Sequence, residues 1–461
     1  MHFGIVCVPQ RIGGSSGRLT PPSKGFVDVL LLCLFIDRSL AFLGPGCIMR
    51  LFIRGIILLV VALVVRNSSA SDPDSVRAAL AHFAARESSR FSDGRMSFDR
   101  DLRDVDWQQF ENLKDLKGLK EICLQTASVT DADLIHLQGF VELVSLTLWE
   151  TKVRGSGLKH LAALPNLRNL TIHPFDDEGL SSLQHLPGLK FLNLYGATVT
   201  DDGLRQLGTL VGLESLDLMR TPITDAGLPH LASLRNLRTL SLDNNPAITN
   251  AALPSIARLK SLRSLSLIGT SVTDIGPLAV LPQLESLDLQ GTNVTSDGLA
   301  ELHRFHSLRV LRLAGNDVDA FALQFVSRTP QLEKLALCHS KVTDTALPHL
   351  AGLKTLKVLE LWNTKVTDTG IVSLQNVTAL EELDLMGTGL GDAGMAALAT
   401  LPRLKVLNAS RTSISDGSLP SILKMTALEE FDPIDTELSQ KGTEELRRLR
   451  PSLSIAVDAP P

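Results

Sequence analysis

The sequence predicts an α/β solenoid, a curved horseshoe with a parallel sheet on its concave face and short helices on its convex face. Three observations carry this prediction. A pattern of leucine, two residues, leucine, one residue, leucine starts at Leu332, Leu356 and Leu380, at intervals of 24 residues. Within each unit, the last two leucines alternate with other residues, as in a strand with one buried face. The second half of each unit places apolar residues three apart, as in a short helix.

Thirteen such units follow one another over residues 117–425, most of them 24 residues long. Each unit of such an array contacts only its neighbours, so a long chain need not divide into separate globular domains. Helices are wider than the strand spacing of ~4.8 Å, so the stack must curve with its sheet on the inside. We therefore expect one continuous repeat array as the body of the protein.

The pattern decays after residue 425, where Pro433 occupies the place of the third leucine. Proline cannot donate a hydrogen bond to a sheet and is excluded from central strands. Residues 444–455 predict a last helix followed by a strand, and residues 458–461 form a short tail. We therefore expect residues 426–461 to be a C-terminal cap and tail that close the core.

At the other end, residues 49–70 have the three parts of a signal peptide. A basic segment at 49–54 precedes an eleven-residue apolar run at 55–65, and small residues follow at 68–70. The apolar run is shorter than the ~20 residues that span a bilayer. We expect a secreted, periplasmic or cell-surface protein, with an uncleaved membrane anchor as the alternative. Residues 1–48 show no clean pattern, and we interpret them as an over-called upstream extension.

Between the signal and the array, residues 71–95 predict a short helix and a polar linker. Residues 96–116 are richer in large apolar side chains, among them Trp107 and Phe110. The first unit of an array would otherwise expose its core to water, so a terminal cap is required. We expect residues 96–116 to be that N-terminal cap.

The charge balance argues against a nucleic-acid-binding protein. The chain has 45 basic and 50 acidic residues, and the first seventy residues hold seven of the basic and two of the acidic ones. The rest of the chain therefore holds 38 basic and 48 acidic residues. Surfaces that bind nucleic acids need clustered Lys and Arg, so we expect no nucleic-acid partner.

The two cysteines of the array, Cys123 and Cys338, lie nine units apart in the sequence. At ~4.8 Å per strand their separation is ~43 Å, whereas a disulfide needs Cα atoms within ~7 Å. We therefore expect two free thiols.

The units resemble the leucine-rich repeat family over about two-thirds of the chain. The form Thr224-Asp225-Ala-Gly227-Leu228 is similar to that of secreted bacterial repeat proteins, and to the repeat class attached to F-box domains. No F-box precedes residue 117, so the resemblance does not imply a substrate-adaptor role. The family usually carries an asparagine after the strand. Here threonine mostly takes that place, and its hydroxyl can do similar hydrogen bonding.

A column of acidic residues recurs at the start of the helical half of the units. Stacked carboxylates suit Ca²⁺, but Asn250 and Ser296 stand in the same column and are poor ligands for it. We therefore interpret the column as helix N-caps, which a short acceptor side chain supplies. Its members are Asp131, Asp177, Asp201, Asp225, Asp274, Asp344, Asp368, Asp392 and Asp416.

The sequence offers no motif for catalysis or for a cofactor. Gly-rich phosphate loops, Cys-x-x-Cys pairs and nucleophile motifs are absent from it. Four histidines share a column in the helical half, but a metal site needs several ligands that converge on one point. We interpret these histidines as solvent-exposed, and we expect neither metal nor cofactor. They are His136, His160, His230 and His349.

The outward positions of the strands are mainly acidic, with Arg312 and Lys334 as the basic exceptions. This pattern predicts an acidic concave face that is strongest near its C-terminal end. Such a face attracts a basic partner by long-range electrostatics, and the alternative is that its charges only keep the sheet soluble. The residues that define the face are Asp217, Asp288, Glu360, Glu382 and Asp384.

The outward position after the third leucine collects large side chains, which we call the concave stripe. Two of the three tryptophans and the only tyrosine of the chain fall in this column, which also holds Cys338. Side chains at this position leave the sheet on its solvent side. Exposed aromatic and methionine side chains are typical of binding hot spots, and the alternative is that they only cover neighbouring strands. We expect two contact zones, formed by Trp149, His173, Tyr195 and Met219 and by Trp362 and Met386.

These observations favour a monomeric, non-catalytic protein that binds a protein or another macromolecule on its concave face. A structural cell-surface or envelope protein is the second hypothesis. The recognition arm of an enzyme complex is the third. The residues outside the array are too few for a catalytic domain of ~100–200 residues, which disfavours catalysis within this chain.

Overall fold

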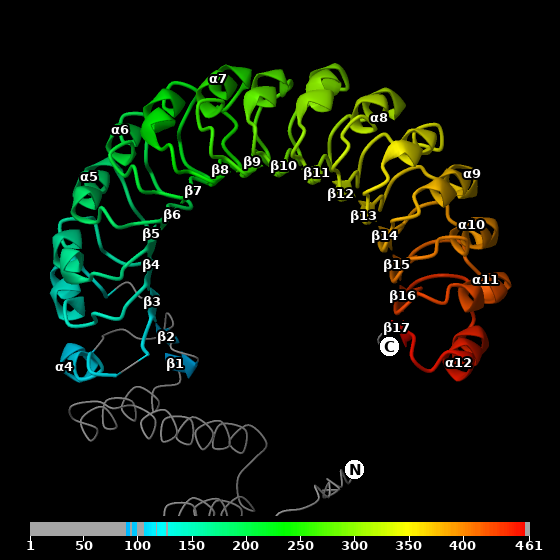
Figure 1. Ribbon diagram of the computed structural model, residues 1–461. Helices are drawn as coiled ribbons and strands as arrows, with labels where there is room; N and C mark the ends of the chain where they lie inside the picture. Colours follow the sequence, from blue (N-terminus) through cyan, green and yellow to red (C-terminus); the bar gives the residue numbers. More distant parts are fainter. Residues whose placement is uncertain (1–88, 93–94, 99–105, 117, 126–127, 457–461) are drawn as a thin grey trace, which may run out of the picture.

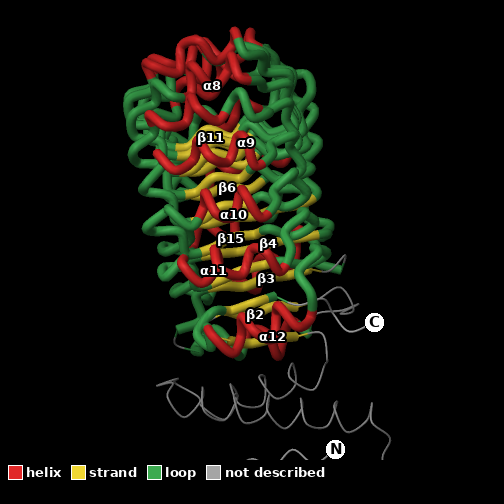
Figure 2. Tube along the Cα trace, turned by 90° about the vertical axis from the view of Figure 1, so that its right-hand side faces the viewer, coloured by secondary structure: helices red, strands yellow, loops and turns green. Residues whose placement is uncertain are grey.

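The protein is an arch lined on its inner side by strands and covered on its outer side by helices (Figure 1). The computed structural model describes residues 89–92, 95–98, 106–116, 118–125 and 128–456. Viewed at right angles, the strands stack like successive rungs (Figure 2). The predicted horseshoe is confirmed. The predicted signal peptide, the upstream extension and the short helix that follows lie outside the described residues.

In the part of the chain that the structure describes, seventeen strands form one sheet. Most have only three residues, because each repeat places one short extended segment on the concave side. They are β1 Ser89–Ser92, β2 Arg95–Phe98, β3 Glu121–Gln125, β4 Ser145–Trp149, β5 Asn169–His173, β6 Phe191–Asn193, β7 Ser215–Asp217, β8 Thr239–Ser241, β9 Ser264–Ser266, β10 Ser286–Asp288, β11 Val310–Arg312, β12 Lys334–Ala336, β13 Val358–Glu360, β14 Glu382–Asp384, β15 Val406–Asn408, β16 Glu430–Asp432 and β17 Ser454–Ile455.

The convex side carries α-helices and 3₁₀ helices (η), since a 24-residue repeat leaves room for only one or two helical turns. The α-helices are α4 Trp107–Glu111, α5 Asp177–Leu180, α6 Leu204–Leu207, α7 Leu253–Ile256, α8 Ala320–Val326, α9 Asp368–Ile371, α10 Asp392–Leu398, α11 Leu419–Lys424 and α12 Gln440–Leu449. The 3₁₀ helices are η2 Asp131–Leu137, η3 Leu158–Ala163, η4 Ser181–His185, η5 Leu228–Ser233, η6 Asn250–Ala252, η7 Gly276–Val280, η8 Asp297–Arg304, η9 Leu347–Gly352, η10 Val372–Asn376 and η11 Asp416–Ser418.

From β2 onward, each strand pairs in parallel with the next strand in the sequence. The register keeps equivalent residues side by side, so that Leu287 aligns with Leu265 and with Leu311. Columns in the sequence are therefore columns in space, and residues at one repeat position form a continuous line along the arch.

The two ends of the sheet differ from the predicted boundaries. The polar linker proposed within residues 71–95 contains β1, which pairs antiparallel with β2, and β2 pairs in parallel with β3. A strand there covers the open edge of the first repeat, a tertiary demand that a polar local composition does not reveal. At the other end, β16 and β17 continue the parallel register inside the predicted C-terminal cap.

The core is a stack of leucines between the sheet and the helices, and it is sealed at its N-terminal end by aromatic rings. Phe110 of α4 is fully buried and packs on Phe140, with ring centroids 5.1 Å apart. Met96, Leu113 and Leu116 are buried beside them. These side chains cover the N-terminal end of the leucine core.

Neighbouring repeats are joined on the convex side by the aspartate column, which we call the aspartate seam. The carboxylate of Asp201 accepts hydrogen bonds from the backbone N–H of Thr224 at 2.8 Å and from its hydroxyl at 2.6 Å. The carboxylate of Asp225 does the same with Thr249 of the following repeat, at 2.7 and 2.6 Å. Equivalent bonds to the next repeat are made by Asp131, Asp177, Asp344, Asp368, Asp392 and Asp416.

The interpretation of these aspartates as N-caps is therefore wrong. In several repeats the aspartate is already the first helical residue, and the Thr or Ser before it is the extended N-cap. Thr249, for example, has φ −124° and ψ −171°, and its side chain accepts from the N–H of Ala251. The aspartate side chain is left free to reach the adjacent repeat. Asp274 is an exception, since it bonds to Gly276 of its own repeat.

Glycine in the Asp-x-Gly segment lets the repeats approach each other. A Cβ atom on Gly298 would lie 2.0 Å from the carbonyl oxygen of Thr273 in the preceding repeat. A Cβ atom on Gly157 would lie 2.2 Å from the carbonyl oxygen of Asp131. Real atoms cannot approach so closely, so the recurrence of glycine at this position follows from the spacing of the repeats.

Candidate binding surface on the concave sheet

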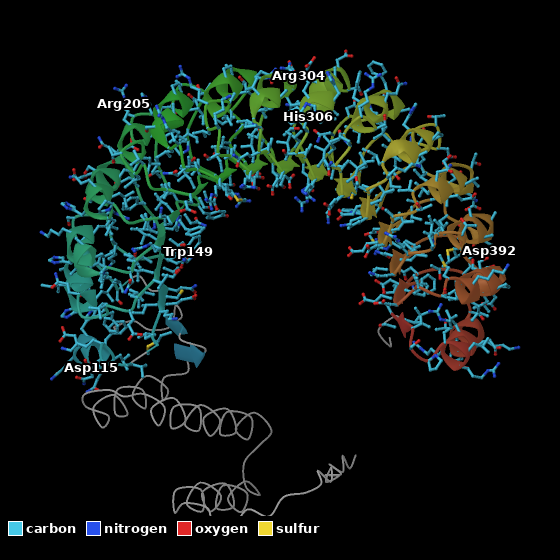
Figure 3. All side chains as sticks on the ribbon, in the orientation of Figure 1. Asp115, Trp149, Arg205, Arg304, His306 and Asp392 are labelled. Carbon is cyan, nitrogen blue, oxygen red and sulfur yellow. The ribbon has the colours of Figure 1, made fainter. Side chains whose placement is uncertain are left out.

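Three rings of the concave stripe pack together near the N-terminal end of the arch. Trp149 stacks on His173, with centroids 4.7 Å apart and planes at 27°, and lies 5.6 Å from the ring of Tyr195. The guanidinium of Arg220 lies 5.7 Å from the centroid of the Tyr195 ring and donates to its hydroxyl at 2.9 Å. We call Trp149, His173, Tyr195 and Arg220 the aromatic shelf. Trp149 lies on the inner side of the arch, whereas Arg205 lies on the outer side (Figure 3).

The aromatic shelf is held in place by the backbone around it. The Nδ1 atom of His173 lies 3.0 Å from the carbonyl oxygen of Tyr195, and the N–H of Tyr195 donates to the Asn193 side chain at 2.8 Å. Arg220 has a φ of +56°, which turns the chain sharply after the strand. Strand alternation therefore does not predict its position, and the sequence reasoning missed it.

The second predicted zone holds a tryptophan with a different neighbour. The ring of Trp362 meets His339 edge to face at 4.2 Å, and His339 also has a positive φ, of +53°. Met386 is the next stripe residue along the arch, and both Trp362 and Met386 are half-buried. Met219 is half-buried in the same column beside the aromatic shelf.

The prediction that Cys338 faces solvent is wrong. Its side chain lies at an outward position but is only 1% exposed, and its Sγ atom is 3.9 Å from a carboxylate oxygen of Glu360. The short thiol is shielded by longer neighbours. Burial, with the nearby Glu360 carboxylate, raises the pKa of the Cys338 thiol to about 12. Both Cys123 and Cys338 are free, as predicted.

Beside the aromatic shelf, strands β5 to β8 present a shallow depression of about 300 Å³. We call its polar lining the polar floor. It consists of Asn169, Thr171, Asn193, Ser215, Asp217, Thr239 and Ser241. Phe191 lines the same depression and is 48% exposed. Phe191 is an aromatic residue at an outward-facing strand position. Alternation along the strand could have identified it, but the sequence reasoning missed it.

Two residues of the polar floor are fixed by a local hydrogen-bond network. The Asn193 amide donates to one carboxylate oxygen of Asp217 at 3.1 Å, and the other oxygen accepts from the N–H of Met219 at 2.9 Å. Each side chain thus also accepts a hydrogen bond from the backbone N–H two residues further along the chain, just after the strand ends. These hydrogen bonds fix the orientation of the Asn193 and Asp217 side chains in the polar floor.

The predicted acidic face is partly neutralised. Asp288 is nearly buried, and its carboxylate lies 3.5 Å from the guanidinium of Arg312. Burial raises the pKa of Asp288, although bonds from Gln290 and the charge of Arg312 oppose the rise. Glu360 forms an ion pair with Lys334. The sequence analysis identified Arg312 and Lys334 as basic residues of this face but did not predict their ion pairs.

Glu382 and Asp384 lie beside Glu360 at the C-terminal end of the concave face, whereas Asp217 lies apart on β7. Burial raises the pKa of Asp384, and the nearby carboxylates of Glu360 and Asp432 add to the rise. Asp384 lies beside Glu360 in register, and Glu382 precedes it by two residues on the same strand. Within the described part of the chain, no Lys or Arg forms an ion pair with Glu382 or Asp384. At this end of the concave face, Glu382 and Asp384 thus carry negative charge that no ion pair within the described residues balances.

Two segments of the chain, residues 280–302 and 378–399, match the family model described as Leucine Rich repeat. Together with the parallel register of the strands, this decides the architecture. Its fold is that of a leucine-rich repeat solenoid.

Solved structures with similar architecture include other leucine-rich repeat proteins. An internalin from Listeria monocytogenes is 19% identical, with a TM-score of 0.42 over 80% of this chain and 87% of that one. A leucine-rich repeat protein of Leptospira interrogans is 20% identical, with a TM-score of 0.47 over 75% and 80%. A plant peptide hormone receptor in complex with RGF2 is 16% identical, with a TM-score of 0.39 over 76% and 68%. No curated protein sequence matches this chain.

One rim of the leucine-rich repeat arch carries a ladder of alternating charges. Glu214 lies between Lys190 at 3.1 Å and Arg238 at 3.4 Å. Further along, the same repeat position gives the pairs Arg263–Glu285, Arg309–Glu333, Lys357–Glu333 and Lys405–Glu381. Such exposed pairs contribute little to stability, because water and salt screen their charges. They balance the charge of this rim, so the rim is not a strongly charged docking surface.

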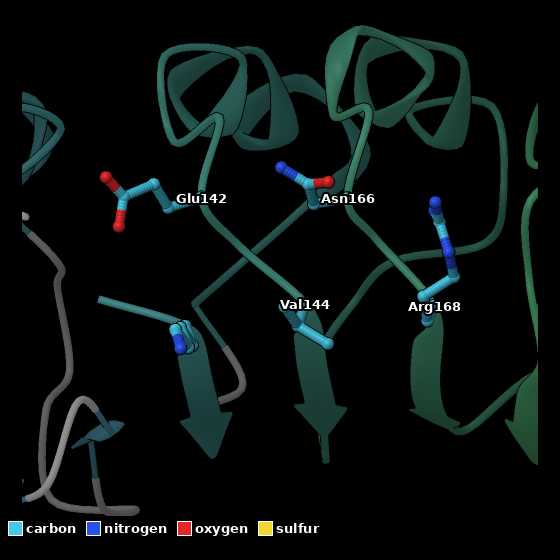
Figure 4. A pocket seen from close by; sticks show the side chains of 5 residues that line it. Glu142, Val144, Asn166 and Arg168 are labelled. Atoms are coloured by element: carbon cyan, nitrogen blue, oxygen red, sulfur yellow. The ribbon is translucent and has the colours of Figure 1, made fainter. Parts of the chain in front are cut away.

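A second depression of the leucine-rich repeat array, of about 350 Å³, lies where β4 and β5 begin (Figure 4). Its polar groups already bond to nearby loops. Glu142 accepts from the N–H of Gly118 at 2.9 Å, and the Asn166 amide donates to the carbonyl oxygen of Val141 at 2.9 Å. Arg168 donates to the carbonyl oxygen of Pro165 at 2.9 Å. We assign no ligand to this depression, because its polar side chains serve the loops.

The four histidines of the predicted column are half-buried on the helical side of the repeats. His136 stacks on Trp107 at 5.1 Å and lies 2.5 Å from a carboxylate oxygen of Glu111. Among the described residues, no three His, Cys, Asp or Glu side chains gather as a metal site requires. No helix in the described ranges is long and apolar enough to cross a membrane.

Proposed function

We propose that this leucine-rich repeat protein is a non-catalytic binding protein that holds a macromolecular partner, most simply another protein, on its concave face. The observation that carries the proposal is the concave stripe. Large aromatic side chains stand there on the open side of a sheet, packed on one another at Trp149 and half-buried at Trp362. Partly exposed aromatic residues with fixed orientation are the usual centres of protein interfaces.

The differentiation of the stripe favours binding over a purely structural role. An array that only packs against itself can repeat one contact in every unit. Here the stripe changes from rings to Asp243, Gln290 and Ala314 and then returns to a tryptophan. The two zones therefore offer different surfaces to one partner. A recognition arm of a larger enzyme is compatible with the same surface, but no observation favours that role specifically.

The proposed location is outside the cytoplasm, where a secreted or surface-bound array meets its partner. This part of the proposal depends on the signal-like residues 49–70. The partner is expected to carry positive charge opposite β14, because Glu382 and Asp384 form no ion pair with Lys or Arg in the described part of the chain. We also propose that the protein acts as a monomer.

The test is affinity capture from the producing organism with wild-type protein and with Trp149→Ala and Trp362→Ala variants. Wild-type protein should retain a specific partner, and each substitution should weaken binding by about 2 kcal/mol, as for an interface hot spot. Val211→Ser is the matched control, since Val211 is an apolar residue that is 57% exposed and precedes the strand rather than lying on the stripe. The proposal fails if the partner binds all variants equally. Mass measurement of the free protein in solution tests the monomeric state.

A further inference from the structure

The polar floor and the aromatic shelf together form a surface with two kinds of chemistry. Along one strand, same-face residues are ~6.8 Å apart, so Tyr195 stands one step beyond Asn193, and Phe191 one step before it. Tyr195 of the aromatic shelf therefore borders the polar floor on one side, and the ring of Phe191 stands within the floor, between Asn169 and Ser215. The depression has a volume of about 300 Å³, which is at the small end of ligand sites.

The polar floor is almost uncharged. Asp217 is the one ionisable residue in its lining, and both of its oxygens already accept hydrogen bonds, from Asn193 and Met219. Asn, Ser and Thr side chains can both donate and accept. Such a lining suits a neutral ligand rich in hydroxyl groups, which also donate and accept.

One acceptor of the polar floor lacks a partner. The carboxamide oxygen of Asn169 is shielded from water and accepts no hydrogen bond within the described part of the chain. A buried acceptor without a donor is energetically unfavourable, because it has lost its hydrogen bonds to water. Asn169 lies beside Phe191 in register and lines the depression, so its carboxamide is next to the space that a ligand would occupy. Ligand binding would then satisfy a group that the free protein leaves unsatisfied.

An extended peptide fits this surface less well. Peptides that add to a sheet need a free edge with unpaired backbone groups, whereas strands β5 to β8 are paired with neighbours on both sides. Peptide specificity also requires separate pockets for side chains. The polar floor presents small side chains in one shallow depression instead.

We propose that the polar floor binds a short neutral oligosaccharide, with the C–H face of a pyranose ring stacked on the aromatic shelf. The equatorial hydroxyls of the sugar bond to Asn193, to Asn169 and to the Ser and Thr hydroxyls around them. This inference rests on the proposed function only in taking the concave face as the binding surface. The inference goes beyond the proposed function because it names a ligand class for the segment between β4 and β8.

The experiment is calorimetric titration of the full-length protein with the neutral tetrasaccharides maltotetraose, cellotetraose and chitotetraose. At least one should bind saturably with a Kd of about 1 mM or tighter, and should change the fluorescence of Trp149. Asn193→Ala and Trp149→Ala should each weaken that binding at least about tenfold. Asn408→Ala is the matched control, because Asn408 accepts from the N–H of Ser410 in the same geometry at 3.1 Å but lies on β15, outside the depression.

The proposal is overturned if none of the three sugars binds up to about 10 mM, or if Asn193→Ala and Asn408→Ala have the same effect. It is also overturned if a defined synthetic peptide, and no sugar, competes for the surface in an Asn193-dependent manner. These outcomes are separable from failure of the proposed function. Loss of protein capture in Trp362→Ala tests the second zone, which the sugar does not touch.

Discussion

The aspartate seam and the concave stripe both contribute one residue per repeat, and they differ in how much that residue varies. Along the seam, most repeats from Asp131 to Asp416 make the same bond from a carboxylate to the next repeat. Asn250 makes it with an amide oxygen, and Asp274 bonds within its own repeat. Along the stripe, the side chain changes from Trp149 to Met219, Cys338 and Trp362. A position that must hold neighbouring repeats at a fixed spacing varies little in residue type. A position that faces solvent is free to differ, and we infer that its differences serve recognition.

The comparison predicts that the two columns fail in different ways. Changes on the seam side should lower stability and leave the concave surface unaltered. Changes on the stripe should leave the fold nearly unaltered and lower affinity. Each prediction below tests one side of this contrast.

The largest effect is expected for Gly298→Ala, because the new Cβ atom would lie 2.0 Å from the Thr273 carbonyl oxygen. The backbone must move to accept it, so the free energy of unfolding should fall by about 3 kcal/mol. Gly352→Ala is the control, since its Cβ atom would meet nothing closer than 3.7 Å. Urea unfolding compares the two. Equal stability of the two variants would show that the repeats tolerate a wider spacing.

The next effect is expected at the seam itself. Asp201→Ala removes the acceptor for the N–H and the hydroxyl of Thr224, and should lower the free energy of unfolding by about 2 kcal/mol. Asp202→Ala changes a neighbouring carboxylate that is 87% exposed, and it should change stability by less than about 0.5 kcal/mol. Urea unfolding of the two variants measures this difference. A similar loss in both variants would remove the seam's special role.

A smaller effect concerns the acidic end of the concave face. If a basic partner is attracted there, its association rate should fall several-fold as salt rises past the point at which the Debye length is about 10 Å. Glu382→Gln should reduce that salt dependence, whereas Glu301→Gln, on the convex helix η8, should not. Stopped-flow mixing over a salt series measures both. A rate that is indifferent to salt would assign these charges to solubility alone.

The smallest effect is a stability gain at Asp384. Burial and the carboxylates of Glu360 and Asp432 raise its folded pKa above the ordinary 3.8, so ionisation costs stability at higher pH. Asp384→Asn should therefore stabilise the protein by about 0.5 kcal/mol at pH 7. The gain should vanish below the unfolded pKa, where both states are protonated.

Asp392 on the seam should behave in the opposite way. Burial acts to raise its pKa, but bonds from Ser415 and Ser418 outweigh burial and lower it. Its contribution to stability is present above the unfolded pKa and is lost as pH falls through the folded pKa. Asp392→Asn should thus lower stability at pH 7. Unfolding curves recorded at pH 7 and at a pH below the unfolded pKa compare the two variants with the wild-type protein. A loss of stability in Asp384→Asn at pH 7 would contradict the account.

The leucine pattern was sufficient to predict the strands, their parallel order and the face to which each residue belongs. Trp149, His173 and Tyr195 could be placed in one column because alternation and register are both periodic. The partner of Asp201 could not be predicted in this way. It is Thr224 of the next repeat, and which residue stands opposite depends on how the repeats stack in space.

The other missed features arise where periodicity ends. Arg220 and His339 follow the stripe at positive φ, so strand alternation no longer applies to them. Cys338 is outward by alternation yet buried, since a short thiol is shielded by longer neighbours. Strand β1 escaped notice because its pairing with β2 is required by the open end of the array rather than by its own composition.

The central claim is that the partner rests on the concave stripe. Its most direct test is oxidative footprinting, by mass spectrometry, of the protein alone and in complex with its captured partner. Trp149, Trp362 and Met386 should become protected in the complex, whereas Phe321 and Leu449 on the convex helices α8 and α12, both well exposed, should not. Protection of the convex residues, with the three stripe residues unchanged, would contradict the account.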